Sequence, residues 1–256
     1  MKSIWKGAIG FGLVNIPVKL YSAIQDSHLD LDMLDSKDHS KIKYQRINET
    51  SRKEVPYERI VKGYYLKDRY IVLEDEDFED AAPKKTKIIE LESFVDIVQI
   101  NPIYYETSYY AMPEPQGKKA YALLLKALAK TKKVGLARFV LRNNEHLCVI
   151  HPLNNVIVIT RIRFQEEIRN LKELDLDLDI ELKTKELQVG IALIKQYSND
   201  FDITSFKDEY SRELLKIIKA KAKGKKVVVK KMQPQKSVSD DLYEQLIHSL
   251  KTKKGA

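Results

Sequence analysis

The residues of this sequence with the clearest chemical potential are lysines that recur at helical spacing. Lys119, Lys126 and Lys130 are separated by seven and four residues, so a helix would place them on one face, and Lys133 follows three residues later. No carboxylate stands four residues away to relieve their mutual repulsion. Such a row becomes favourable against phosphates, because each neutralised phosphate releases a condensed counterion. It therefore predicts a phosphate-binding surface, with a merely solvated helix face as the alternative.

The same segment carries the apolar stripe that such a helix needs. Tyr121, Leu124, Leu125 and Leu128 fall at i, i+3, i+4 and i+7, on the face opposite the lysines. The strand-like sequence that follows extends the positive surface, because alternate residues of a strand share a side. Residues 116–144 contain eight bases and no acid, and all eight are candidate DNA contacts: Lys118, Lys119, Lys126, Lys130, Lys132, Lys133, Arg138 and Arg142.

A second basic segment lies at the end of the chain. Residues 216–256 contain twelve lysines and three acids, a net charge of +9. Because the whole chain carries +8, the residues outside the two basic segments sum to −9. We expect the lysines of this segment to contact a polyanion as well, and the candidates are Lys221, Lys223, Lys225, Lys226, Lys230 and Lys231.

Other residues with potential chemistry are better explained by structure. His146, Cys148 and His151 are zinc-ligand types, but in a strand His151 points away from the other two, and no second cluster supplies a fourth ligand. Asp175, Asp177 and Asp179 lack the glycine of a calcium loop and alternate with apolar residues as a half-buried strand would. A metal-dependent nuclease at the aspartates stays a weaker alternative. Neither a nucleophile with a base nor a phosphate loop is recognisable, so we expect no enzyme activity, no metal and no cofactor.

Two tyrosine pairs leave another function open. Tyr104–Tyr105 and Tyr109–Tyr110 could stack on unpaired bases, which would make the protein a non-enzymatic groove or single-strand DNA binder. Packing at a barrel or dimer surface explains the same pairs equally well, because tyrosine joins an apolar body to a polar tip.

The elements that must position these residues are mostly short strands followed by helices. The 256 residues can bury a substantial core, and no apolar run is long enough to span a bilayer or to form a signal peptide, which predicts a cytoplasmic protein. A helical period appears after residue 183, a flexible linker is expected over 224–239, and a short helix over 240–250. Strands are expected within 4–24 and over 41–47, 69–74, 86–91, 94–100, 103–111, 134–142, 146–151 and 155–163, a pattern typical of a barrel or sandwich.

Several sequence motifs of the chain resemble those of a known family. The segment Trp5–Tyr21, which reads WKGAIGFGLVNIPVKLY, closely resembles the opening of the bacterial Ku proteins. Further motifs of that family follow in order within about residues 1–220: Val55–Tyr64, Asn101–Tyr105, Lys119–Leu124, Gly135–Arg142 and Phe206–Tyr210. The chain departs from the family at residues 48–53, where Ku proteins often carry a glycine or a cysteine pair, so no metal is placed there.

The resemblance implies a mixed α+β, mainly β fold: a Ku-type β-barrel core with an arm or bridge that forms a DNA-encircling ring, followed by a C-terminal helical arm. It implies the domains 1–182 (barrel and bridge), 183–222 (helical arm for dimerisation) and 223–256 (Lys-rich tail with a terminal helix). It also implies a homodimer that binds double-stranded DNA ends in non-homologous end joining, associates with the nucleoid, and recruits an ATP-dependent DNA ligase of the ligase D type.

The resemblance also assigns roles to residues. The basic block Lys118–Arg142 would line or flank the DNA channel, and the Lys-rich tail would touch DNA outside the ring. Four bases in the region that corresponds to the arm are further candidates: Lys43, Arg46, Arg52 and Lys53. In the terminal helix, Leu242, Leu246, Ile247 and Leu250 are candidates for partner docking, although the helix could equally pack on its own body.

Overall fold

The chain is built from two compact units. The computed structural model describes residues 1–81, 87–141, 144–177, 179–225 and 242–251. One unit comprises Met1–Ser27 and Asp32–Glu173, and the other comprises His28–Leu31 and Leu174–Ala256. Within the described residues, no helix is long and apolar enough to cross a membrane.

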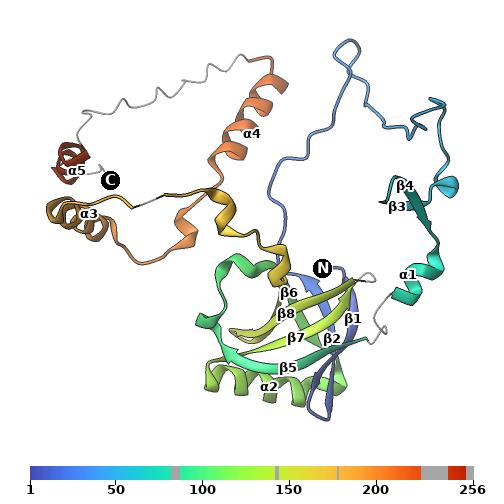
Figure 1. The fold of residues 1–256 in the computed structure, drawn as a ribbon, viewed down its shortest axis with the longest axis horizontal. Helices are drawn as coiled ribbons and strands as arrows, with labels where there is room; N and C mark the ends of the chain where they lie inside the picture. Colours follow the sequence, from blue (N-terminus) through green and yellow to red (C-terminus); the bar gives the residue numbers. More distant parts are fainter. Residues whose placement is uncertain (82–86, 142–143, 178, 226–241, 252–256) are drawn as a thin grey trace. The chain divides into compact units, whose positions relative to one another are not determined.

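The first unit contains a closed barrel of seven strands (Figure 1). Neighbouring strands pair in antiparallel fashion, except that β1 and β5 pair in parallel, from Ala8 opposite Ile88 to Gly10 opposite Glu90, and so close the barrel. The strand order around it is β1-β2-β6-β9-β8-β7-β5. The strands are β1 (Trp5–Phe11), β2 (Val14–Ser22), β5 (Ile88–Asp96), β6 (Tyr105–Pro113), β7 (Lys133–Leu141), β8 (Asn144–Leu153) and β9 (Val156–Ile162).

Alternation of side chains fills the barrel with aliphatic residues. Ile16, Val18 and Leu20 of β2 are fully buried, and the residues between them are not, which is the period of two expected for a strand with one face in a core. Cys148 of β8 lies in the same interior, and burial raises the pKa of its thiol well above the ordinary value. The thiol is therefore a small apolar core group and not a nucleophile.

Helix α2 (Lys118–Thr131) packs against the barrel (Figure 1). Tyr121 enters the core, where its hydroxyl donates to Ala111 O at 2.7 Å and accepts from Ile157 N at 2.6 Å. Leu124 and Leu128 of the same face are buried. Just before the helix, Gly117 lies against Pro17, where an added Cβ would come within 2.9 Å of Pro17 Cδ. The barrel contacts thus fix the helix and its outward face.

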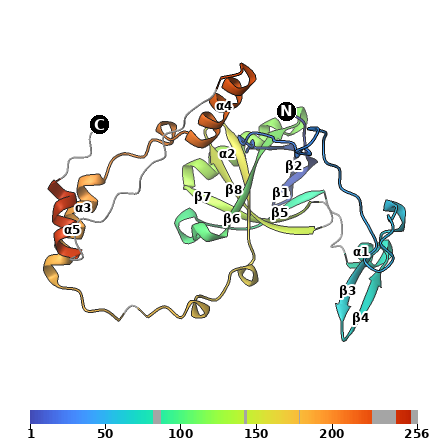
Figure 2. The same cartoon turned by 90° about the horizontal axis from the view of Figure 1, so that it is seen from above.

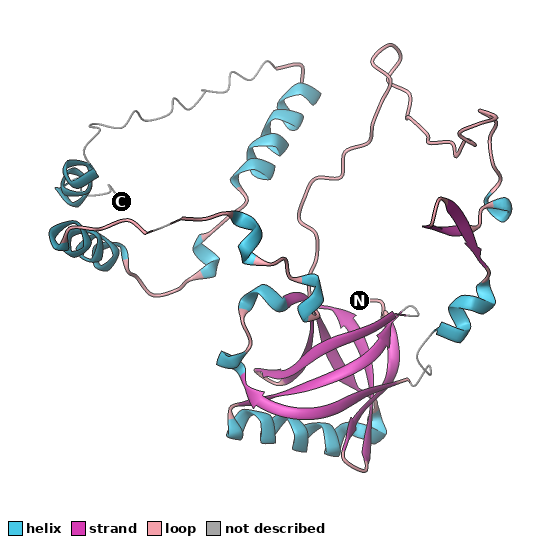
Figure 3. Cartoon of the chain, in the orientation of Figure 1, coloured by secondary structure: helices cyan, strands magenta, loops and turns pink. Residues whose placement is uncertain are grey.

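A long insertion between β2 and β5, residues 23–87, belongs to the first unit except for His28–Leu31, and we call it the arm. It leaves the barrel after Ser22 and returns at Ile88. Apart from its regular elements, the described part of the arm is loop and turn (Figure 3). Those elements are a 3-10 turn at Tyr57–Arg59, the antiparallel strands β3 (Lys62–Leu66) and β4 (Arg69–Leu73), and α1 (Asp75–Ala81).

The second unit is helical in its described part. It contains α3 (Thr184–Tyr197), α4 (Glu209–Ala222) and α5 (Leu242–Lys251). No residue of α3 or α4 is buried, so their apolar stripes are open. Helix α4 ends in a Schellman motif: Gly224 has a φ of 70°, Lys225 N donates to Ala220 O, and Gly224 N donates to Lys221 O.

Most elements agree with the sequence-based predictions, and the differences lie in the arm and the acidic segments. The strand predicted over 41–47 is wrong, because this stretch contains only isolated bridges at Lys41 and Ile47. The strands predicted at 86–91 and 94–100 are one bulged strand, β5, followed by a 3-10 turn. The prediction that residues 175–181 alternate as a half-buried strand is also wrong, because the described residues there are exposed and irregular. Strand β3 and helix α1 were not predicted.

We predict that α2 is anchored by one apolar face. Replacing Leu124, which is 1% exposed, by alanine should lower the free energy of unfolding by about 2–5 kcal/mol, because it leaves a cavity between helix and barrel. The neighbouring Leu123 is 63% exposed, so Leu123→Ala should change stability by less than about 0.5 kcal/mol. Urea denaturation followed by circular dichroism measures both, and equal losses would contradict this packing.

Candidate nucleic-acid interface

The lysines predicted to form a row on a helix do lie on the outward face of α2. Lys118, Lys119, Lys126 and Lys130 are all exposed, and we call these four the α2 lysines. The last three lie on the side of the helix away from Tyr121 and Leu124, and Lys118 lies at the start of the helix beside them. Within the described part of the chain, none of the four forms an ion pair. Their charges are therefore available to an external anion.

The start of α2 concentrates this positive potential. Lys118 and Lys119 occupy its first turn, where the helix dipole adds a partial positive charge and acidic residues are usually favoured. The nearest carboxylate before the helix, Glu114, already pairs with Lys6 at 3.1 Å and Lys19 at 3.5 Å. The hydrogen bond from Lys6 contributes most to holding the pKa of Glu114 below its ordinary value. Glu114 stays ionised but is engaged with Lys6 and Lys19, so it does not neutralise Lys118 or Lys119.

Two other bases of the predicted block are neutralised by the barrel. The prediction that Lys133 continues the helical row is wrong, because α2 ends at Thr131 and Lys133 begins β7. Its Nζ lies 2.8 Å from Asp96 Oδ2. Arg138 lies between two acids, with Nε 2.8 Å from Glu92 and a guanidinium nitrogen 3.5 Å from Glu145.

The remaining bases of the block are Lys132 and Arg142. Lys132 is exposed and ends the helix with a left-handed φ of 56°. Arg142 lies outside the described residues. The free charge of this region thus belongs to α2 and its C-cap, and not to the strand that follows.

The arm brings most of its predicted bases into one loop. Asn48 closes this loop: its side chain accepts from Ser51 N at 2.8 Å, and its backbone accepts from Arg52 N. Arg52 and Lys53 are thereby exposed at the tip, and Arg46 lies at the base with its guanidinium 5.5 Å from the ring centre of Tyr57. Lys43 is exposed but stands before the loop.

Sequence reasoning missed further bases of the arm. Lys62, Lys67 and Arg69 belong to the β3–β4 ribbon and are exposed. The usual sequence signal for such a ribbon is a glycine-containing two-residue turn, whereas here the turn is Lys67–Asp68 with φ values of 46° and 62°. Counting the bases and acids would have found this segment, since residues 40–73 hold nine Lys and Arg against four Asp and Glu.

The tyrosine pairs singled out in the sequence are part of the barrel. Tyr109 is 7% exposed and belongs to the core, so it cannot stack on a base. Tyr104 and Tyr105 pack against Val134, Val149 and Ile162 on the outside of the barrel, and burial raises the pKa of Tyr105. Tyr109 is therefore excluded as a stacking partner, and Tyr104 and Tyr105 are engaged in packing on the barrel.

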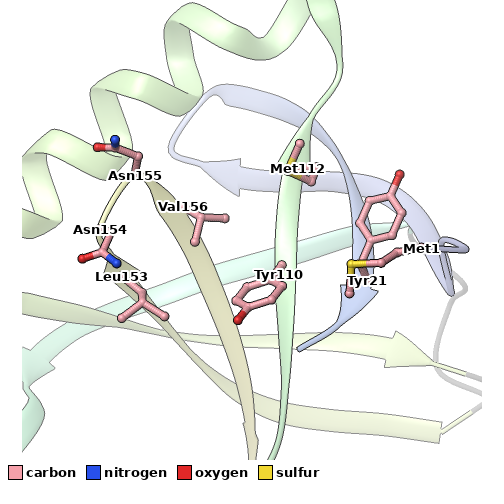
Figure 4. A pocket seen from close by; sticks show the side chains of 8 residues that line it. All are labelled: Met1, Tyr21, Tyr110, Met112, Leu153, Asn154, Asn155 and Val156. Atoms are coloured by element: carbon pink, nitrogen blue, oxygen red, sulfur yellow. The ribbon is translucent and has the colours of Figure 1, made fainter. Parts of the chain in front are cut away.

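Tyr110 lines an apolar pocket of about 650 Å³ on the outer face of β6 (Figure 4). Tyr21 and Met112 lie beside it, and Leu153 and Val156 face it from the β8–β9 turn (Figure 4). The polar groups of the lining are two turn asparagines and the tyrosine hydroxyls, and the lining contains no basic side chain. It therefore contributes nothing to phosphate binding.

The potential metal ligands are separated by the fold. Cys148 points into the barrel, whereas His151 lies near the outer face with Nε2 3.1 Å from Thr160 Oγ1. Burial lowers the pKa of His151. Within the described residues, no three His, Cys, Asp or Glu side chains converge as a metal site would require.

Comparison with known proteins identifies the family. The family model described as the Ku70/Ku80 beta-barrel domain matches residues 10–189. The non-homologous end joining protein Ku of Archaeoglobus fulgidus is 37% identical over 245 residues, which cover 94% of this chain and 97% of that protein. This chain belongs to the Ku family. Proteins of the same name from Bacillus subtilis and Heliobacterium modesticaldum are each 36% identical, covering 94% and 98% of this chain and 79% and 91% of the relatives.

In this Ku-family chain, some of the predicted tail lysines lie within the residues that the structure describes and others lie outside them. Lys221, Lys223 and Lys225 cluster at the end of α4, where cations also complement the negative end of the helix dipole. Lys226, Lys230 and Lys231 lie outside the described residues. The tail lysines therefore stay predictions as DNA contacts.

The terminal helix of this Ku-family chain lies against α3 of its own unit. Gln196 Nε2 donates to Leu250 O at 3.4 Å, and Leu246, Ile247 and Leu250 are half-buried. The side chain of Leu242 is not described. The sequence left open whether this helix packs on its own unit, and part of α5 does so. Docking of another protein on α5 stays a prediction.

We predict that the α2 lysines, unlike the paired bases, bind phosphates. Replacing Lys126 and Lys130 together by glutamine should make the dependence of log affinity for duplex DNA on log salt shallower by roughly 2, because about 0.9 is lost per phosphate contact. Arg138→Gln should leave the slope nearly unchanged, because Glu92 and Glu145 already neutralise this base. Fluorescence anisotropy titrations at several salt concentrations measure the slopes, and equal changes in both variants would contradict the assignment.

Proposed function

We propose that this chain binds double-stranded DNA ends, as a homodimeric ring without sequence specificity, in double-strand break repair by non-homologous end joining. The observation that carries the proposal is the 37% identity to a non-homologous end joining protein Ku along 97% of that relative's length. The barrel and its inserted arm support it, because the match spans both.

The distribution of free charge supports binding to the DNA backbone. The α2 lysines and the arm bases Arg46, Arg52 and Lys53 are exposed cations on loops and on one helix. Such groups recognise phosphates, whereas base identity is read by side chains placed in the grooves. We infer that the arm encloses the duplex, that the α2 lysines flank the channel, and that the tail lysines touch DNA beyond it.

The open helices of the second unit support a homodimer. Leu187, Ile191 and Ile194 of α3 are 54%, 43% and 70% exposed, although they form a regular apolar stripe. Helix α4 leaves Tyr210 75% exposed. Stripes of this kind are normally covered, and a second copy of the chain is the partner that the family resemblance supplies.

The proposal assigns this chain no catalytic step. Joining would then require a second protein, and we infer that this is an ATP-dependent DNA ligase of the ligase D type. The end of α5 with Leu246, Ile247 and Leu250 is the proposed docking segment, to the extent that packing on α3 leaves it accessible.

We predict that binding requires a free DNA end. A ring can thread onto a linear duplex but not onto the same duplex closed into a circle, so affinity for a linear fragment should exceed that for its circle by at least tenfold. Competition between labelled linear DNA and the unlabelled circle or linear fragment measures the difference. Equal competition by both forms would exclude the ring and leave an ordinary duplex binder.

We predict that α3 forms the subunit interface. Ile194→Asp should shift the free protein from dimer to monomer, because a charge in a covered apolar stripe would be desolvated without a partner. Lys195→Asp places the same carboxylate one residue further, off the stripe, and should leave the dimer intact. Light scattering coupled to size-exclusion chromatography gives the mass, and a dimer that persists in the Ile194 variant would place the interface elsewhere.

A further inference from the structure

The β3–β4 ribbon of the arm presents a bare aromatic surface. Its register sets Tyr65 opposite Tyr70 and Gly63 opposite Val72, so these four residues share one face, which we call the tyrosine face. The two rings meet at 5.1 Å between centroids with an angle of 61°. Tyr65, Tyr70 and Val72 are 57%, 72% and 55% exposed. Figure 2 shows β3 and β4 as a two-stranded ribbon that is separate from the barrel sheet.

The arm uses the opposite face of the ribbon for its own packing. That face carries Lys62, whose Nζ lies 4.7 Å from the ring centre of Phe78 in α1. Ile71 and Leu73, on the same side, are half-buried. Tyr64 and Leu66 on that side stay 65% and 49% exposed, so the arm covers it only in part, whereas all three side chains of the tyrosine face are more than half exposed. A two-stranded ribbon alone is only marginally stable, so a partner would also stabilise it.

The surroundings of the tyrosine face are cationic. Its turn, Lys67–Asp68, places Lys67 at the tip of the ribbon beside the aromatic pair, and Arg69 follows directly, on the face of Leu66. The same interleaving runs through the arm, where each exposed tyrosine stands within two residues of a lysine or arginine. These tyrosines are Tyr44, Tyr57, Tyr64, Tyr65 and Tyr70.

This combination matches one class of ligand best. Proteins that bind single-stranded nucleic acid combine cations along the backbone with aromatic rings on which bases stack. Within a duplex the base faces are already stacked, except the outer face of the terminal pair, so unpaired bases offer such rings far more surface than a blunt end does. An apolar protein partner would account for the tyrosines but not for the excess of nine bases over four acids in residues 40–73.

We propose that the tyrosine face binds the unpaired nucleotides of a single-stranded overhang at a DNA end. The bases stack on Tyr65 and Tyr70, and Lys67 at the tip of the ribbon contacts a neighbouring phosphate. The inference deepens the proposed function and rests on it. It implies that ends with short overhangs are held more tightly than blunt ends, whatever their sequence, because every base has an aromatic face.

The test compares two ends on the same full-length protein. Duplexes with one end closed by a hairpin loop carry, at the other end, either a blunt terminus or an overhang of four thymidines, and anisotropy gives both affinities. We expect the overhang to be bound about fivefold or more tightly, the gain from one stacked base. In a Tyr65→Ala, Tyr70→Ala double variant the advantage should vanish while the affinity for the blunt end stays within about twofold.

Matched variants separate stacking from other effects. Tyr65→Phe with Tyr70→Phe keeps both rings and should keep the overhang advantage. Tyr64→Ala removes a tyrosine that is 65% exposed on the opposite face of the same ribbon and should leave the overhang advantage unchanged. Quenching of 2-aminopurine placed in the overhang should accompany binding by the parent protein and be lost in the alanine variant.

Three outcomes would overturn the inference. Equal affinity of the parent protein for blunt and overhanging ends would refute it while leaving end binding intact. Equal weakening of both ends by the alanine substitutions would show that the face acts on the duplex. A change of the free protein from dimer to monomer in the alanine variant would make the face a subunit contact. A parent protein that binds no linear DNA would refute the proposed function itself.

Discussion

The parallel pairing of β1 with β5 is the interaction on which the rest of the first unit depends. These strands are separated in sequence by β2 and by the whole arm, yet Ala8, Ile9 and Gly10 pair with residues 88–90 and complete the barrel. Both ends of the arm are thereby attached to one closed, packed structure. A long and irregular insertion can therefore carry exposed cations and aromatic rings, because its own packing does not have to supply the stability of the fold.

The barrel also explains how α2 tolerates an outward face of unpaired lysines. Like charges on one helix face are unfavourable, and Lys118 and Lys119 oppose the helix dipole as well. These costs are each a fraction of a kcal/mol to about 1 kcal/mol, whereas burial of one leucine contributes about 1.5–3 kcal/mol. Leu124 and Leu128 are buried on the other side, so packing outweighs the electrostatic cost. The charge of these exposed lysines is thus not compensated by other groups of the protein and is available to a polyanion.

Elements that depend on local periodicity could be predicted from the sequence, whereas contacts between residues far apart in the chain could not. The α2 stripe and most barrel strands follow from spacing alone, and the family motifs identified the barrel. Arg138 looked free because its partner Glu92 stands 46 residues earlier and becomes its neighbour only when β5 pairs with β7. Tyr109 and Tyr110 looked equivalent, but alternation puts one in the core and the other outside. The β3–β4 ribbon was missed because its turn lacks the glycine that usually marks one.

The two modes of DNA contact inferred for this chain are compatible, because both are indifferent to base identity. Lysines such as Lys126 on a helix face recognise phosphates, which repeat identically along any duplex. Tyrosine rings such as those of Tyr65 and Tyr70 recognise the flat face that every base shares. A repair protein meets ends of any sequence, so groove contacts that read base edges would restrict it. The tyrosine face of the ribbon, which Val72 and Gly63 complete, fits this requirement. It carries no side-chain amide or carboxylate, and its tyrosine hydroxyls both donate and accept, so they favour no particular base.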